Sequence, residues 1–155
     1  MSINARIFSI VLSAIIAAAF FLPWFTLLVF TSVNRISGFH MVRTFVEGVR
    51  GEDRGPMTME YFMLAISMIV LALVPLSAIN NLVRSIMRSD TRFTRMLPFA
   101  SIVLFIILMA LGIIDQSSGR VAKALLEMAG FLSFGFYVAF ISAGILSMLK
   151  NSHSA

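Results

Sequence analysis

Apolar residues occur in four long runs that are separated by short polar segments. The runs cover about residues 7–30, 61–83, 98–114 and 124–149, and no charged side chain lies near the middle of any of them. A helix of about 20 apolar residues crosses the ~30 Å hydrocarbon layer of a bilayer. The pattern therefore predicts an all-α membrane protein: a four transmembrane helix bundle that forms a single domain over residues 1–155.

The first run begins like a signal peptide, because Arg6 precedes an apolar core and small residues follow it. The apolar run continues past these small residues through Leu22, so we interpret it as a retained span. Pro23 then removes a helical hydrogen bond. We expect a kink that lets the span continue to about Phe30; the alternative is a helix that stops at Pro23, followed by a surface strand in Phe25–Val33.

The outer loop, residues 31–60, contains one amphipathic segment. Its apolar residues recur every three or four positions, which predicts a short amphipathic helix on the outer side of the bundle: Ile36, Phe39, Val42, Val46 and Val49. Ser37 can cap the start of this helix, and Gly48 or Gly51 can end it.

Charge indicates orientation and partners. The chain has 12 Lys and Arg against 7 Asp and Glu, and charged residues make up only 12% of it. In so apolar a chain, basic residues are typical of the cytoplasmic face and of contact with anionic lipid rather than nucleic acid. Basic residues divide equally between the two sides, but those on one side lie closest to the span ends, which favours N-in and C-in.

Four arginines form a possible lipid-binding stripe after the second run. If that helix continues beyond the membrane, the spacing of four, four and three places them on one side: Arg84, Arg88, Arg92 and Arg95. We interpret them as anchors to lipid phosphate, with binding of a regulatory lipid or an acidic loop as the alternative. Ser89 and Asp90 could instead interrupt the helix and separate the arginines.

The second run also contains a possible polar kink, formed by Pro75, Ser77, Asn80 and Asn81. Neighbouring hydroxyl and amide groups can satisfy the carbonyl that a membrane proline frees. We interpret these residues as a packing kink. The alternative is a local opening that lines a polar cavity.

Small residues indicate helix–helix contacts in the first and fourth runs. Gly135, Ala139 and Ala143 recur every four positions, as do Ala14 with Ala18 and Ser13 with Ala17. Such spacing lets helix backbones approach closely. The two stripes could pack inside one chain or form an interface between chains.

Catalytic signatures are absent from the sequence. It has no Cys, only two His, no phosphate-binding loop and no carboxylate pair within a run. We therefore predict that the protein is not an enzyme and has no cofactor. A Cu(I) site from His40 and nearby methionines is disfavoured, because Met is scattered through every run and commonly fills apolar gaps.

One local pattern resembles small uncharacterised bacterial four-span membrane proteins. Phe21-Leu22-Pro23-Trp24-Phe25 is followed by Ile36-Ser37-Gly38-Phe39, similar to the Leu-Pro-Trp that closes their first span and the Ser-Gly-Phe that opens their outer loop. The family often has an acidic residue next, where this chain has His40. The resemblance implies a tetraspan fold in the bacterial inner membrane but does not imply any particular activity.

Three functions fit these features. The leading hypothesis is a non-catalytic accessory or assembly subunit of a larger membrane complex, with lipids and other membrane subunits, or further copies of itself, as partners. The alternatives are an oligomeric pore or small-solute carrier, and an adaptor that senses anionic lipid.

Overall fold

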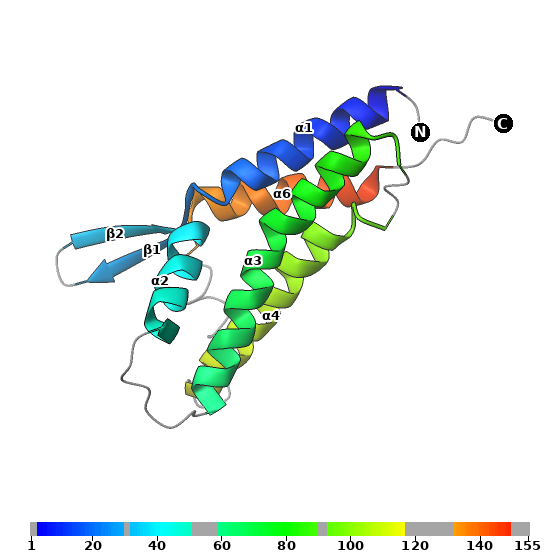
Figure 1. The fold of residues 1–155 in the computed structure, drawn as a ribbon. Helices are drawn as coiled ribbons and strands as arrows, with labels where there is room; N and C mark the ends of the chain where they lie inside the picture. Colours follow the sequence, from blue (N-terminus) through cyan, green and yellow to red (C-terminus); the bar gives the residue numbers. More distant parts are fainter. Residues whose placement is uncertain (1–2, 30–31, 51–58, 90–92, 117–131, 150–155) are drawn as a thin grey trace.

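A computed structural model of the chain describes residues 3–29, 32–50, 59–89, 93–116 and 132–149. Within these residues, five helices pack together beside one antiparallel hairpin (Figure 1). The elements are α1 (Ile3–Ala19), β1 (Pro23–Val29), β2 (Ser32–Ser37), α2 (Gly38–Arg50), α3 (Met59–Ile86), α4 (Leu97–Gln116) and α6 (Phe134–Met148). The predicted helical bundle is confirmed at this level.

The four longer helices surround a common core. α1 packs between α3 and α6, α4 packs on α3, and α6 also contacts α4. The core contains Ile16, Leu71, Val74, Ile102 and Leu146, none of which exposes any of its side chain. Burial of large aliphatic groups at helical spacing gives these helices their common interior.

The predicted spans differ in helix length: one is long enough to cross a membrane, and the others are shorter over the residues whose side chains are described. In the described part of the chain, α3 alone contains a helix long and apolar enough to cross a membrane, over Phe62–Ile86. Three shorter apolar helical stretches cover Ile3–Ala19, Leu97–Leu111 and Phe134–Met148, and the last of these, α6, has 15 residues, about 22 Å. The fourth run was predicted to be helical from residue 124. Leu132 and Ser133 are not helical, and residues 117–131 lie outside the described residues.

The predicted extension of the first span to Phe30 is wrong. α1 ends at Ala19, and strand β1 begins at Pro23. Proline has no N–H to donate to the Ala19 carbonyl, and two other donors use that oxygen instead. The Leu22 amide donates to it over 3.1 Å, and the Trp24 indole Nε1 donates over 2.7 Å. The indole therefore satisfies the end of the helix that proline terminates.

Trp24 also fixes the hairpin to the bundle. It is the extra residue at an irregularity of the β1–β2 register, between the pairs Pro23–Ser37 and Phe25–Ile36. Its side chain is completely buried and meets the ring of Phe136 edge-on at 5.5 Å, while its carbonyl accepts the Ser133 amide at 2.8 Å. One residue thus joins α1, β1 and α6.

Two glycines allow the close approaches at this joint. A Cβ on Gly135 would lie 2.7 Å from the Pro23 carbonyl oxygen, and a Cβ on Gly38 would lie 2.7 Å from the Phe20 ring. The first contact would be with backbone, which cannot move aside as a flexible side chain can. The hairpin and α2 are therefore held in fixed positions at one end of the bundle.

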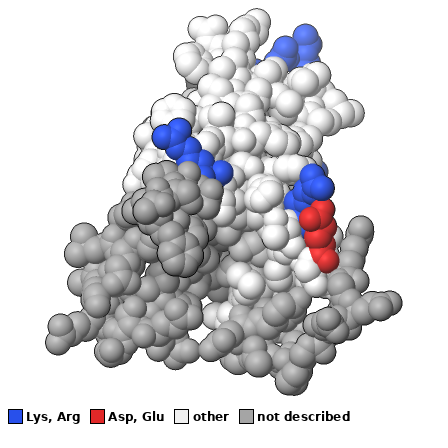
Figure 2. Space-filling model, turned by 90° about the vertical axis from the view of Figure 1, so that its left-hand side faces the viewer, with Lys and Arg blue, Asp and Glu red and all other residues white. Residues whose placement is uncertain are grey.

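The predicted amphipathic helix is present as α2. Ser37 caps it as expected, because its Oγ accepts the His40 amide at 3.1 Å. Gly48 lies within the helix and does not end it. On the exposed side, a 2.7 Å hydrogen bond to the Glu47 carboxylate, reinforced by its charge, raises the pKa of Arg43. Figure 2 views the molecule from the hairpin side, where the described surface is largely uncharged.

Candidate functional site

A chain of buried polar side chains joins α1, α3 and the residues before α4. Asn81 donates from Nδ2 to the hydroxyls of Ser9, at 3.0 Å, and Ser13, at 2.8 Å. Its Oδ1 accepts the Thr94 hydroxyl at 2.9 Å, and Ser9 shares a hydrogen bond with Ser85 at 3.0 Å. All five side chains are buried. We call this set the polar network: Ser9, Ser13, Asn81, Ser85 and Thr94.

The spacing of the network gives the direction of packing. Ser9 and Ser13 are four residues apart on α1, and Asn81 and Ser85 are four apart on α3, so each pair lies on one helix face. Ser13 bonds to Asn81, whereas Ser9 bonds to both Asn81 and Ser85. The earlier residue of α1 thus reaches the later residue of α3, which shows that the two helices are antiparallel. Because the amide and its hydroxyl partners satisfy one another, their burial does not carry the cost of an unpaired polar group.

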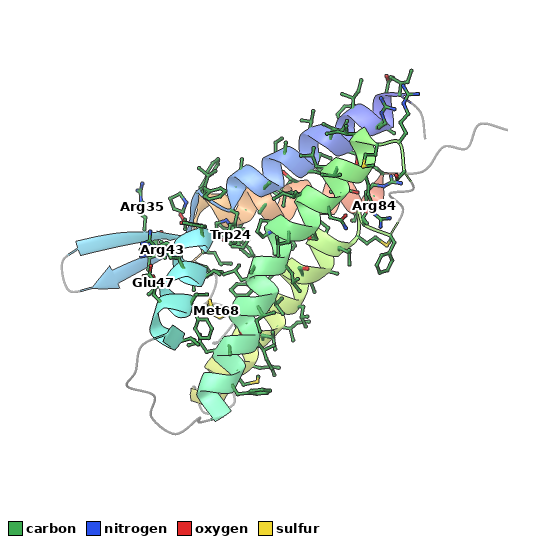
Figure 3. All side chains as sticks on the ribbon, in the orientation of Figure 1. Trp24, Arg35, Arg43, Glu47, Met68 and Arg84 are labelled. Atoms are coloured by element: carbon green, nitrogen blue, oxygen red, sulfur yellow. The ribbon has the colours of Figure 1, made fainter. Side chains whose placement is uncertain are left out.

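Four helix ends meet on the far side of this network from the hairpin. They are the start of α1, the end of α3, the start of α4 and the end of α6 (Figure 1). Arg95 is 2% exposed, and its Nη1 donates to the Leu149 carbonyl over 2.7 Å, linking the α4 start to the α6 end. Arg84 lies at this end of the bundle, opposite Arg35, Arg43 and Glu47 (Figure 3). We call this region the basic end.

Arg6 belongs to the basic end as well. It lies one helical turn before Ser9, on the side of α1 that meets α3. Its side chain is half-buried, and its Nε atom is buried with no hydrogen-bond partner among the described residues. A buried guanidinium donor without an acceptor is costly, which favours an anionic group beside it.

The predicted arginine stripe does not lie on one helix. Arg84 is exposed on α3, whereas Arg88 follows the end of α3 in a left-handed conformation with φ 57°. The Ser89 amide donates to the Arg84 carbonyl at 3.0 Å, which closes α3 in a Schellman-type turn. Arg95 is on the other side of the connection to α4, and Arg92 lies outside the described residues. The predicted interruption near Ser89 is what separates them.

The predicted helix–helix contact residues divide into two groups. Gly135, Ala139 and Ala143 are buried within the single chain on the inner side of α6. Ala14 and Ala18 are exposed on α1, while Ser13 of the second stripe is fully buried. The inner side of α1 is therefore set by Ser9, Ser13 and Ile16.

The predicted kink residues do not share one face. α3 is helical through Pro75, and the Ser77 hydroxyl donates to the Val74 carbonyl at 2.9 Å. Asn81 is buried in the polar network, but Asn80 is exposed. Neighbouring amides thus occupy different surroundings, because a step of one residue turns a helix by about 100°.

Sequence reasoning missed the partners of Asn81. The four-residue spacing of Ser9 with Ser13, and of Asn81 with Ser85, was the available signal. Hydroxyl and amide groups at such spacing in apolar helices commonly bond across helices. Arg6 carried no signal of its own, because its burial depends on how α1 packs against α3.

No known protein family matches the chain, and neither a curated protein nor a solved structure matches it.

Proposed function

We propose that this protein is a non-catalytic accessory or assembly subunit of a larger integral membrane complex. It would cross the membrane four times, through α1, α3, α4 and α6, with the basic end in the cytoplasm. α2 and the hairpin would lie on the outer side.

The observation that carries the proposal is the apolar outer surface of all four long helices. Large apolar side chains are exposed along each of them, among them Phe8 on α1, Ile69 on α3, Ile107 on α4 and Ile141 on α6, which expose between 48% and 61% of their surface. Such a surface is unfavourable in water and matches hydrocarbon. Ser9 and Ser13 of α1 and Asn81 and Ser85 of α3 point inward instead and bond to one another.

The rigid joint at Trp24 supports a role in assembly. It holds the hairpin and α2 at fixed positions relative to the bundle, so these elements can present one defined surface to a partner. α2 packs on α3 and exposes Phe39 and Val46 on its outer side. Preorganised elements lose less entropy when they bind.

The test combines purification with site-specific crosslinking. Photoreactive residues would replace Val46 on α2 and, separately, Ile69 on α3, and the protein would be purified from native membranes in mild detergent. We expect one membrane protein in stoichiometric amount, crosslinked from a defined subset of positions. A single small species with no stoichiometric partner, before and after crosslinking, would contradict the proposal.

A pore or small-solute carrier is less well supported. The polar side chains that would line it are divided between the buried network, which contains Asn81, and the exposed surface, which contains Asn80. An anionic-lipid adaptor is favoured by the basic end, whose chemistry can be stated more specifically.

A further inference from the structure

Arg6 and Arg88 lie at the same end of the antiparallel pair formed by α1 and α3. Ser9 hydrogen-bonds to Ser85 at 3.0 Å. Arg6 precedes Ser9 by three residues, and Arg88 follows Ser85 by three residues. Because the two helices run in opposite directions, both steps lead toward the same end of the pair, where Arg88 lies just beyond the last residue of α3. Arg84, one residue before Ser85, is exposed on the last turn of α3 at the same end.

The carbonyl groups at the ends of α3 and α6 already accept hydrogen bonds from other donors. The guanidinium groups of Arg6, Arg84 and Arg88 can therefore bind another ligand. The last carbonyl groups of α3 accept amide hydrogens within the turn, from Met87 to Val83 at 2.9 Å and from Ser89 to Arg84 at 3.0 Å. The Leu149 carbonyl of α6 accepts from Arg95. The Nε atom of Arg6 is buried without a partner among the described residues.

Among the side chains that the structure describes, Glu47 supplies the one carboxylate. It is on α2, at the hairpin end, and bonds to Arg43. Asp90 follows Arg88 closely in sequence and lies outside the described residues. An acceptor for Arg6 would come from a residue outside the described ranges, such as Asp90, or from a bound anion, and the experiment below separates Asp90 from an anion.

We propose that Arg6 and Arg88, with Arg84 at the rim, bind the phosphate group of an anionic phospholipid at the basic end of the bundle. A guanidinium offers a planar set of N–H donors that matches phosphate oxygens, and charge strengthens each hydrogen bond. The lipid is the favoured source of the phosphate because α1 and α3, farther from the basic end, expose apolar side chains that suit acyl chains, including Val11 on α1 and Ile79 on α3. The inference assumes the membrane location of the proposed function but does not depend on a protein partner.

The experiment measures lipid binding to the purified full-length protein. Phosphatidylglycerol would be titrated in detergent and the bound lipid counted by native mass spectrometry, for the wild type and for Arg6→Gln, Arg88→Gln and Arg35→Gln. Arg35 is exposed at the other end of the molecule, so its variant removes the same charge away from the site. We expect about a tenfold loss of affinity for Arg6→Gln and Arg88→Gln, and wild-type affinity for Arg35→Gln.

Three results of this titration, repeated with Asp90→Asn, would overturn the proposal. Equal affinity in the wild type and Arg6→Gln would mean that Arg6 does not touch the lipid. An equal loss in Arg35→Gln would mean that net charge, not a site, attracts it. Lipid binding that appears only in Asp90→Asn would identify Asp90 as the natural partner of Arg6.

Three further measurements test the source of the phosphate, the folding of each variant and the need for a planar guanidinium. Millimolar inorganic phosphate should leave the lipid bound. Displacement of the lipid by inorganic phosphate would overturn the assignment to a lipid headgroup. Fluorescence of Trp24, at the opposite end, reports whether each variant is folded. Arg6→Lys keeps the charge but removes the planar donors, and we expect it to bind more weakly than the wild type; wild-type affinity would overturn the assignment. This assay uses the purified protein without a partner. A negative result would therefore reject the lipid site alone, and the crosslinking experiment would still test the role in assembly.

Discussion

At the scale of single residues, Asn81 determines how α1 and α3 fit together. Its amide makes three hydrogen bonds to side chains on α1 and before α4, and it is completely buried. Leucine branches at Cγ in the same way but can make none of these bonds. Replacing Asn81 would therefore leave three buried hydroxyl groups with fewer partners.

We predict that Asn81→Leu lowers the free energy of unfolding by about 1–3 kcal/mol. Asn80→Leu is the matched control, because Asn80 is exposed on the neighbouring position of the same helix, and it should change stability by less than about 0.5 kcal/mol. Thermal unfolding in detergent, followed by Trp24 fluorescence, measures both. Equal effects of the two substitutions would mean that the polar network does not stabilise the bundle.

Arg88 has a backbone conformation that is unfavourable for a residue other than glycine. Its φ of 57° is unfavourable for a side chain with a Cβ and is typical of glycine in a Schellman turn. We predict that Arg88→Gly stabilises the lipid-free protein by about 1 kcal/mol. Arg84→Gly, within the last turn of α3, should destabilise it by about 1 kcal/mol. Unfolding of both variants in lipid-free detergent tests this, and destabilisation by Arg88→Gly would contradict it.

At the scale of elements, Pro23 shows what sequence could and could not predict. The apolar runs gave the approximate positions of α1, α3, α4 and the later part of α6, and the periodicity of the outer loop gave α2. Pro23 left a choice between a kink and a stop. The outcome depends on the Trp24 indole reaching the Ala19 carbonyl, which is a tertiary feature with no local pattern of its own.

The candidate site was less predictable than the helices. The spacing of Arg84 and Arg88 on an extended helix suggested a stripe, but α3 ends at Ile86. The contribution of Arg6 arises from residues far apart in sequence that only the packing of α1 on α3 brings together. Similarly, Ala14 and Ser13 belong to equally regular stripes, and the rotation of α1 in the bundle decides that Ser13 is the buried one.

Substitution of Gly135 tests the close approach between α6 and the hairpin, and substitution of Gly144 on the same helix is the control. A Cβ on Gly135 would meet backbone at 2.7 Å, whereas one on Gly144 would lie 3.8 Å from the Phe99 ring, an ordinary contact. We predict that Gly135→Ala destabilises the protein by about 1–3 kcal/mol. Gly144→Ala should be neutral or stabilising by up to about 1 kcal/mol, because alanine favours a helix. Similar unfolding temperatures for the two variants would show that α6 does not approach Pro23 this closely.

At the scale of the whole molecule, the two ends of the bundle differ in composition. One end carries the hairpin and α2, joined through Trp24. The other end carries Arg84, labelled in Figure 3, together with Arg6 near the start of α1, Arg88 after α3 and Arg95 before α4. Between the ends, the outer sides of the helices are apolar. The proposed crossing places these arginines on the cytoplasmic side and Arg35 and Arg43 on the outer side.

Four crossings require that the start of α1 and the end of α3 lie on one side of the membrane and α2 on the other. The chain has no Cys, so a single introduced thiol can be labelled without background. Asn4, Thr44 and Ser89 are exposed at these three places and suit substitution by cysteine. Each variant would be treated in intact cells with a maleimide that cannot cross the membrane, and again after permeabilisation.

We predict that Thr44→Cys is labelled in intact cells, whereas Asn4→Cys and Ser89→Cys are labelled after permeabilisation alone. This pattern would place α1 and α3 across the membrane, with the basic end in the cytoplasm. Labelling of all three thiols from the same side would contradict the crossing of α1 and α3, and with it the proposal that the apolar surface of this bundle faces lipid.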